Sequence, residues 1–310
     1  MKYFVYQMIR FISFWLPLKI AYWVGEKVTD IRYLFCGTNR KAIEDNLKQV
    51  LGTGSEKEIT GKARKVFHNF AKYIVDFSRF RRINRSNLGN FITIEGMENL
   101  RRAFTAGKGV IALTAHLGNW ELGGITLAIL GYPMNAVALN HEEVSVNRLF
   151  VQQRTSKGVK VIPFGMAAKK CLQALRRNEM VALLGDWDIK SQGIRLPFLG
   201  KLTTLPRGPA VLSLKTGAVI LPGFTIRQRD DRFKLFLEEP IFPESTGDKE
   251  KDVEKLSNQI REVLERYIRR YPEQWFLFHR VWQEKTGDRK QGTGDREYKT
   301  GDRGQKIDER

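Results

Sequence analysis

The chain has 310 residues, enough for one large α/β domain or two smaller ones with a sizeable core. Its formal charge of +19 implies an anionic partner, such as nucleic acid, an anionic membrane, a phosphorylated substrate or an acidic protein. The excess is uneven, because residues 1–110 carry 20 Lys and Arg but only 9 Asp and Glu. The only two cysteines, Cys36 and Cys171, exclude a disulfide framework and a zinc site and favour two small buried side chains.

Residues 3–25 are apolar and rich in aromatic side chains, but Arg10 and Lys19 interrupt them. A spanning helix needs about 20 mostly apolar residues, and no cleavage site of a signal peptide follows. Aromatic rings beside Arg and Lys are typical of the membrane interface. We therefore expect this segment to anchor the chain on a membrane, either lying in the interface or spanning the bilayer. The alternative is a helix that packs on the core of the domain.

Helices and strands alternate along most of the remaining chain. Residues 38–85 are expected to be helical and are strongly basic. Further on, short apolar runs predict strands, and longer amphipathic stretches predict helices. The expected strands are 91–95, 110–115, 135–139, 159–162, 180–184, 218–226 and 232–237, and the expected helices are 97–106, 122–130, 144–156, 167–177, 208–216 and 252–270. This order predicts an α/β fold with a mostly parallel central sheet flanked by helices, which binds its ligand at the carboxyl ends of the strands.

The chain divides into three expected regions. Residues 1–85 form a membrane-associating helical region, and residues 86–284 form the α/β domain. Residues 285–310 repeat Thr-Gly-Asp-Arg three times without an apolar stripe, which excludes a heptad coiled coil. This tail has almost nothing to bury, so we expect it to be disordered.

Two histidines precede a carboxylate by five positions, His116 before Glu121 and His279 before Glu284. The spacing alone is weak evidence, so the surroundings decide between the two pairs. His279 lies in an aromatic stretch, which favours a role in packing. His116 follows a short apolar strand, and Glu121 begins the next helix. This strand, turn and helix are expected to present an imidazole at the edge of the sheet with a carboxylate behind it.

The residues around His116 suit the transfer of a group to a hydroxyl. His116 is expected to accept the proton of an attacking alcohol as general base. Glu121 is expected to hold the proton of the other ring nitrogen, which fixes the tautomer and stabilises the imidazolium. The substrate supplies the nucleophile, because the chain has no Gly-x-Ser-x-Gly elbow, no Cys beside a His and no Walker-type loop. A structural histidine is the alternative that these residues leave open.

The segment Ala-His-Leu-Gly-Asn-Trp-Glu at 115–121 resembles the block with the His-x4-Asp/Glu motif of the glycerolipid acyltransferase superfamily. This version is similar to that of the bacterial lipid A biosynthesis (lauroyl/myristoyl) acyltransferases. Further blocks resemble that family in the same order, at 147–158, 184–200, 204–212, 216–222 and 272–280. The resemblance spans roughly residues 1–282, and it implies that His116 and Glu121 are the catalytic residues.

The resemblance also implies the reaction and its place in the cell. A fatty acyl group is expected to move from acyl-acyl carrier protein, or acyl-CoA, to a hydroxyl of a lipid A precursor. This is a step of lipopolysaccharide biosynthesis at the cytoplasmic side of the cell inner membrane. No metal and no cofactor besides the acyl donor is implied.

The matched blocks contain four candidate substrate-binding residues. Arg154 is expected to bind a substrate phosphate or the oxyanion, or else to be a surface charge. Asp186 and Asp188 are expected to bind sugar hydroxyls or to orient Arg154, unless they only form a turn. Arg207 opens a helix, where the helix dipole disfavours a cation, so contact with a phosphate is expected in preference to a structural role.

The expected partners are acyl carrier protein, an anionic membrane lipid and a phosphorylated glycolipid acceptor. No nucleic acid is expected, because no DNA- or RNA-binding motif is present. A lysophospholipid or a phosphatidylinositol mannoside is the alternative acceptor. Outside the enzymes, the alternative is a basic protein that binds a membrane or nucleic acid without catalysis.

Overall fold

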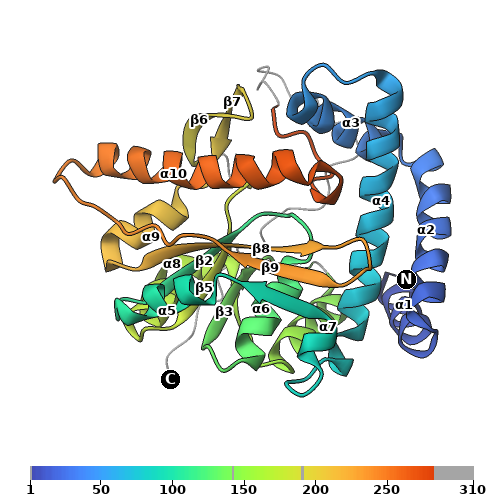
Figure 1. Ribbon diagram of the computed structural model, residues 1–310, viewed down its shortest axis with the longest axis horizontal. Helices are drawn as coiled ribbons and strands as arrows, with labels where there is room; N and C mark the ends of the chain where they lie inside the picture. Colours follow the sequence, from blue (N-terminus) through green and yellow to red (C-terminus); the bar gives the residue numbers. More distant parts are fainter. Residues whose placement is uncertain (1, 142, 190–191, 283–310) are drawn as a thin grey trace, which may run out of the picture.

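The computed structural model describes residues 2–141, 143–189 and 192–282. A group of N-terminal helices stands beside an α/β body (Figure 1). The predicted disordered tail at 285–310 and the carboxylate Glu284 lie outside the described residues.

The centre of the body is a seven-stranded sheet with the strand order β1-β9-β8-β2-β5-β3-β4. Neighbouring strands run parallel, except that β8 and β9 are antiparallel. The strands are β1 (Ile92–Glu95), β2 (Val110–Thr114), β3 (Met134–Ala138), β4 (Lys160–Pro163), β5 (Met180–Leu184), β8 (Val219–Arg227) and β9 (Phe233–Leu237). The prediction of an α/β fold with a mostly parallel sheet is therefore confirmed.

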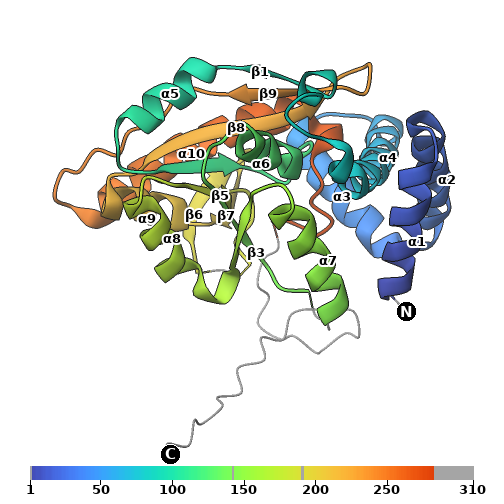
Figure 2. The same cartoon turned by 90° about the horizontal axis from the view of Figure 1, so that it is seen from below.

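Helices cover both faces of the sheet (Figures 1 and 2). Alternate residues of a strand point to opposite faces, so each strand contributes to two cores. In β2, Ile111 and Leu113 join one core, and Val110 joins the other. The first core lies under α8 (Ala167–Arg176), α9 (Gly208–Thr216) and α10 (Lys249–Arg270), and the second lies under α5 (Met97–Thr105), α6 (Trp120–Ile129) and α7 (Val144–Thr155).

A separate antiparallel hairpin, β6 (Ile194–Phe198) and β7 (Lys201–Leu205), was not expected from the sequence. Its two turn residues, Leu199 and Gly200, both have positive φ, +52° and +90°. A two-residue turn of this kind favours Asn-Gly or Asp-Gly. Because a leucine occupies its first position, the sequence carries no signal for this hairpin.

The N-terminal part consists of four helices: α1 (Lys2–Trp15), α2 (Leu18–Phe35), α3 (Gly37–Leu51) and α4 (Glu56–Arg79). The expected helical region at 38–85 is therefore divided, and the break includes Gly52 with φ +70°. The other three helices all pack against α4. Ser55 caps α4 by accepting a hydrogen bond from the backbone N–H of Glu58 at 3.3 Å.

A buried polar cluster ties α2 to the body of the protein. The hydroxyl of Tyr22 in α2 donates to Asp76 in α4 at 2.5 Å, and Asp76 forms an ion pair with Arg227 in β8. One side of α2 is therefore packed, as the core-packing alternative predicts. Among the described residues, no helix has both the length and the apolar character needed to cross a membrane. Association with a membrane stays a prediction.

Candidate active site

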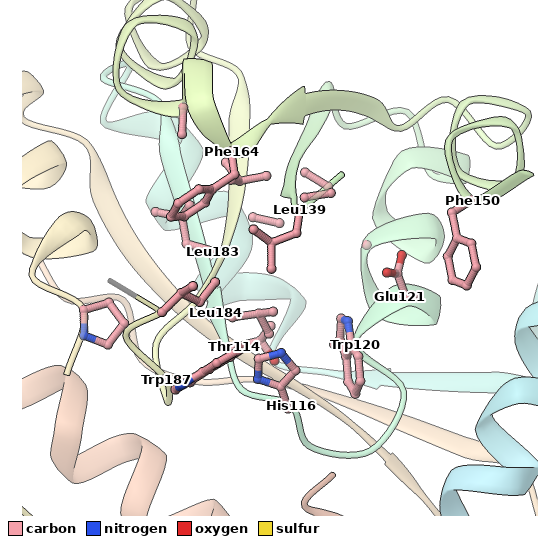
Figure 3. Close-up of a pocket in the computed structure, with 18 of the residues that line it drawn as sticks. Thr114, His116, Trp120, Glu121, Leu139, Phe150, Phe164, Leu183, Leu184 and Trp187 are labelled. Atoms are coloured by element: carbon pink, nitrogen blue, oxygen red, sulfur yellow. The ribbon is translucent and has the colours of Figure 1, made fainter. Parts of the chain in front are cut away.

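His116 lies two residues beyond β2, at the carboxyl edge of the sheet, in the turn that leads into α6 (Figure 3). Two backbone hydrogen bonds fix this turn: the N–H of Phe276 donates to the carbonyl of His116 at 2.7 Å, and the N–H of Gly118 donates to that of Gln274 at 2.9 Å. Gly118 has φ +62°, and a Cβ there would lie 2.1 Å from the carbonyl oxygen of Thr225. The turn that carries the imidazole therefore requires glycine at this position.

Asp186 holds the imidazole of His116. The ring nitrogen Nδ1 lies 3.0 Å from Oδ1, the backbone N–H of His116 donates to Oδ2 at 3.0 Å, and the indole N–H of Trp275 donates to Oδ2 at 2.9 Å. Burial alone raises the pKa of the Asp186 carboxyl, but the charge of His116 and these three hydrogen bonds outweigh burial and lower it. Asp186 is therefore ionised and can only accept. The ring proton must then lie on Nδ1, which leaves Nε2 as the basic nitrogen.

Aromatic rings fix the imidazole from both sides. Figure 3 shows His116 between Trp120 and Trp187. Their rings meet it edge to face, with centroids 5.3 Å and 6.2 Å from that of the imidazole. Tyr73 stacks on Trp120 at 4.7 Å, and the ring of His279 lies 3.9 Å from that of Trp187. The imidazole of His116 is thus held by packing as well as by the carboxylate of Asp186.

His279 lies closer to His116 than its aromatic surroundings suggest. Residues 275–277 are buried, which confirms that this stretch packs in the core. Burial and the nearby His116 lower the pKa of His279 to about 4, although Asp186 acts in the opposite direction. His279 is therefore neutral at neutral pH. The proximity of the two histidines had no signal in the sequence, because the spacing to Glu284 predicts nothing about His116.

Glu121 pairs with Arg154 and not with the imidazole. Nε of Arg154 donates to both carboxylate oxygens, at 2.9 and 3.2 Å, and Nη2 donates to Oε1 at 2.5 Å. The two side chains are 11% and 12% exposed, and opposite charges buried this close together pair with each other. The prediction that Glu121 holds a ring nitrogen of His116 is therefore wrong, because Asp186 makes this contact. Likewise, Glu121 orients Arg154, in place of Asp186 or Asp188.

The other two candidate residues differ in whether they line the cavity. Asp188 lines the cavity, and its Oδ2 accepts from the backbone N–H of Gly193 at 2.6 Å, as a turn-forming Asp does. Arg207 does not line the cavity, and its guanidinium pairs with Glu250 on the surface at 3.1 Å. Contacts of Asp188 with a sugar and of Arg207 with a phosphate stay predictions.

A cavity of about 1320 Å³ opens at the carboxyl edge of the sheet. His116, Glu121 and Arg154 lie in its wall, and Asp186 lies directly behind His116. Most of the remaining wall is apolar, with side chains from β3, β5, α7, α8 and α9. Within the described ranges, no group of three or more His, Cys, Asp or Glu side chains is arranged to hold a metal ion.

These features define a class of enzyme. A histidine held by a buried carboxylate suits the activation of a hydroxyl group, and the apolar cavity beside it suits a substrate with a hydrocarbon part. In agreement, the family description "bacterial lipid A biosynthesis acyltransferase" matches residues 1–284. The chain belongs to this family and is an acyltransferase.

The similar proteins carry two kinds of name. The phosphatidylinositol mannoside acyltransferase of Mycolicibacterium smegmatis is 24% identical over 264 residues, 84% of each chain. The protein of that name from Mycobacterium tuberculosis is 25% identical over 261 residues, 82% of this chain and 80% of its own. The lipid A biosynthesis palmitoleoyltransferase of Escherichia coli is 24% identical over 268 residues, 86% of this chain and 85% of its own. The chain is thus an acyltransferase of the lipid A or glycolipid type.

Proposed function

We propose that the protein transfers a fatty acyl group from acyl-acyl carrier protein, or acyl-CoA, to a hydroxyl group of a lipid A precursor. The observation that carries this proposal is the His116–Asp186 pair at an apolar cavity, in a chain of this family. A thioester already carries an activated acyl group, so the reaction requires a base and a bound alcohol but no nucleophile from the protein.

In the proposed mechanism, the acceptor hydroxyl donates a hydrogen bond to Nε2 of His116. As its oxygen attacks the thioester carbon, Nε2 takes the proton, and the charge of Asp186 stabilises the imidazolium. The new C–O bond forms, the C–S bond breaks, and the proton passes from Nε2 to the departing sulfur. The carboxylate and both indoles keep the ring in one orientation throughout.

Arg154 supplies positive charge to the same site. Its Nε and Nη2 are used by Glu121, and Nη1 makes no hydrogen bond with any residue that the structure describes. A guanidinium fixed in this way suits the oxyanion of the tetrahedral intermediate or a phosphate of the acceptor. Glu121 acts in this proposal as a positioning residue, because it touches Arg154 and not the reacting atoms.

The acceptor is the part of the proposal that the family leaves open. A phosphatidylinositol mannoside is a second candidate, because enzymes named for that lipid match this chain with the same identity as the lipid A enzyme. Purified protein, an acyl thioester and each acceptor in turn decide between them, with the product identified by mass spectrometry. We expect an ester on the lipid A precursor. If the ester forms only on the mannoside, the mannoside is the acceptor and the lipid A precursor is not. If no glycolipid is esterified, the proposal is overturned.

We further propose that the protein docks on the cytoplasmic side of the inner membrane through α1 and α2, which lie in the membrane interface. The surface that supports this combines exposed apolar and basic residues. Phe11, Trp15, Trp23 and Phe35 are 59 to 83% exposed. Tryptophan rings and basic residues together suit an anionic lipid surface, to which each basic residue contributes about 1 kcal/mol.

Replacing both Trp15 and Trp23 with serine is expected to weaken binding to vesicles of anionic phospholipid by at least about tenfold, because two aromatic contacts with the interface are lost. Co-sedimentation with vesicles measures the effect. Phe242→Ser is the matched control, since Phe242 is 45% exposed but lies outside these helices. Equal binding by the double variant and the wild type would contradict the docking surface.

A further inference from the structure

The chain after α10 runs beside α3 and α4 (Figure 1) and also contacts the active site. We call residues 274–281 the C-terminal segment. The backbone N–H of Phe276 donates to the carbonyl of His116 at 2.7 Å. The indole N–H of Trp275 donates to the carboxylate of Asp186 at 2.9 Å. Both members of the His116–Asp186 pair are therefore bonded to this segment.

Asn46 of α3 holds the C-terminal segment in place. Its Nδ2 donates to the carbonyls of Leu277 and His279 at 3.0 and 2.9 Å, and its Oδ1 accepts from the backbone N–H of Val281 at 3.2 Å. A carboxamide has two donor hydrogens and an acceptor oxygen, which is the set that these three groups require. Asn46 is only 2% exposed, so the bonds are shielded from water.

The C-terminal segment depends on these bonds because it has no strand beside it there. No helix or strand among the described residues includes residues 277–281. The carboxamide of Asn46 takes the place of a neighbouring strand, since it bonds to the backbone at three alternate residues. Leu277 is 1% exposed, and a buried carbonyl without a donor is unfavourable. Removing the carboxamide therefore forces the segment to shift until water reaches these groups.

We propose that Asn46 is a positioning residue for acyl transfer, which keeps His116 and Asp186 in their relative orientation through the C-terminal segment. This role rests on the proposed function and adds a residue of the N-terminal helices to it. Asn46 lies outside the wall that the described residues form around the cavity, so it acts through Trp275 and Phe276 and not on a substrate. Helix α3 is thus part of the support of the active site.

Asn46→Ala is expected to lower kcat for acyl transfer by about 10- to 100-fold, because displacing a catalytic group by about 1 Å has an effect of this size. KM for both substrates is expected to stay within about threefold of the wild type, since the cavity wall is unchanged. Asn46→Ser keeps a hydroxyl that donates to one carbonyl, so its loss of kcat is expected to be smaller. The serine variant decides the question if thermal unfolding shows that the alanine variant is not folded.

Gln49, one turn further along α3, provides the matched control. Its Nε2 donates to the carbonyl of Leu199 at 2.9 Å, so it also ties α3 to a distant backbone group. Leu199 lies in the turn of the β6–β7 hairpin and not in the C-terminal segment. Gln49→Ala is therefore expected to keep kcat within a few-fold of the wild type. A folded Asn46 variant with the kcat of Gln49→Ala overturns the positioning role.

Hydrogen–deuterium exchange, followed by mass spectrometry, tests the same link without an activity assay. The backbone N–H groups of His116, Gly118 and Phe276 all donate hydrogen bonds within the site. In the folded Asn46 variant they are expected to exchange at least about tenfold faster than in the wild type, while α9 keeps its rate.

Equal acceleration in α9 indicates a general loss of stability and overturns the positioning role, as does unchanged exchange at the site. If exchange rises only at the site but the wild type makes no ester in any assay, the proposed function is refuted and the link from Asn46 to His116 is supported.

Discussion

Asp186→Asn is expected to lower kcat for acyl transfer by about 100- to 10,000-fold while the protein stays folded, because the imidazole loses its base form. The carboxamide oxygen still accepts hydrogen bonds from the backbone of His116 and from Trp275. Its NH2 group, however, faces Nδ1 and donates to it, which moves the ring proton to Nε2. The nitrogen that must take the proton of the alcohol is then already protonated. His116→Ala is expected to lower kcat by a similar factor, because it removes the imidazole itself.

The control for this experiment lies at the other end of the same strand. Glu179 comes directly before β5, whereas Asp186 comes after this strand. Glu179 is also largely buried, with 8% of its surface exposed. Its partners are Arg177, Lys160 and Asn135, all away from the cavity mouth. Glu179→Gln is therefore expected to change thermal stability but leave kcat within a few-fold of the wild type. A kcat for Asp186→Asn as high as that of Glu179→Gln would remove Asp186 from the mechanism.

The sequence predicts the strands that carry the site with good accuracy, because each is a short apolar run between turns. The expected strand 110–115 is β2 (Val110–Thr114), and the expected helix 208–216 is α9 (Gly208–Thr216). The β6–β7 hairpin is missed, since its turn begins with a leucine whose positive φ no local pattern reveals. Local chemistry thus predicts an element only where that chemistry follows the usual preferences.

The partner of His116 depends on how two distant strands pair. Thr114 at the end of β2 lies opposite Leu184 at the end of β5. His116 and Asp186 each follow two residues later, so the register places them side by side. A sequence pattern shows both residues but not the order of the strands, which is why Glu121, only five residues from His116, is the more obvious choice. The position of His279 also depends on a contact between distant parts of the chain. An isolated bridge between Leu117 and Trp275 holds the segment of His279 beside that of His116.

Breaking the pair of Glu121 and Arg154 is expected to cost about 3–5 kcal/mol of unfolding free energy, because it leaves a charge buried without its partner. Glu121→Met is the test, with chemical denaturation as the measurement. Activity is expected to fall as well, since Arg154 loses the contacts that fix its orientation. This single variant cannot separate loss of structure from loss of function.

The double variant Glu121→Met with Arg154→Met separates them. Replacing both members of a buried ion pair with apolar side chains of similar length removes the unpaired charge, so stability is expected to return to about the wild-type value. Activity is expected to stay at least about 100-fold below the wild type, because a fixed donor to the oxyanion or the acceptor phosphate is absent. If the pair serves only the fold, activity returns together with stability. The same result would remove both residues from catalysis and leave His116 and Asp186 as the machinery on which the reaction depends.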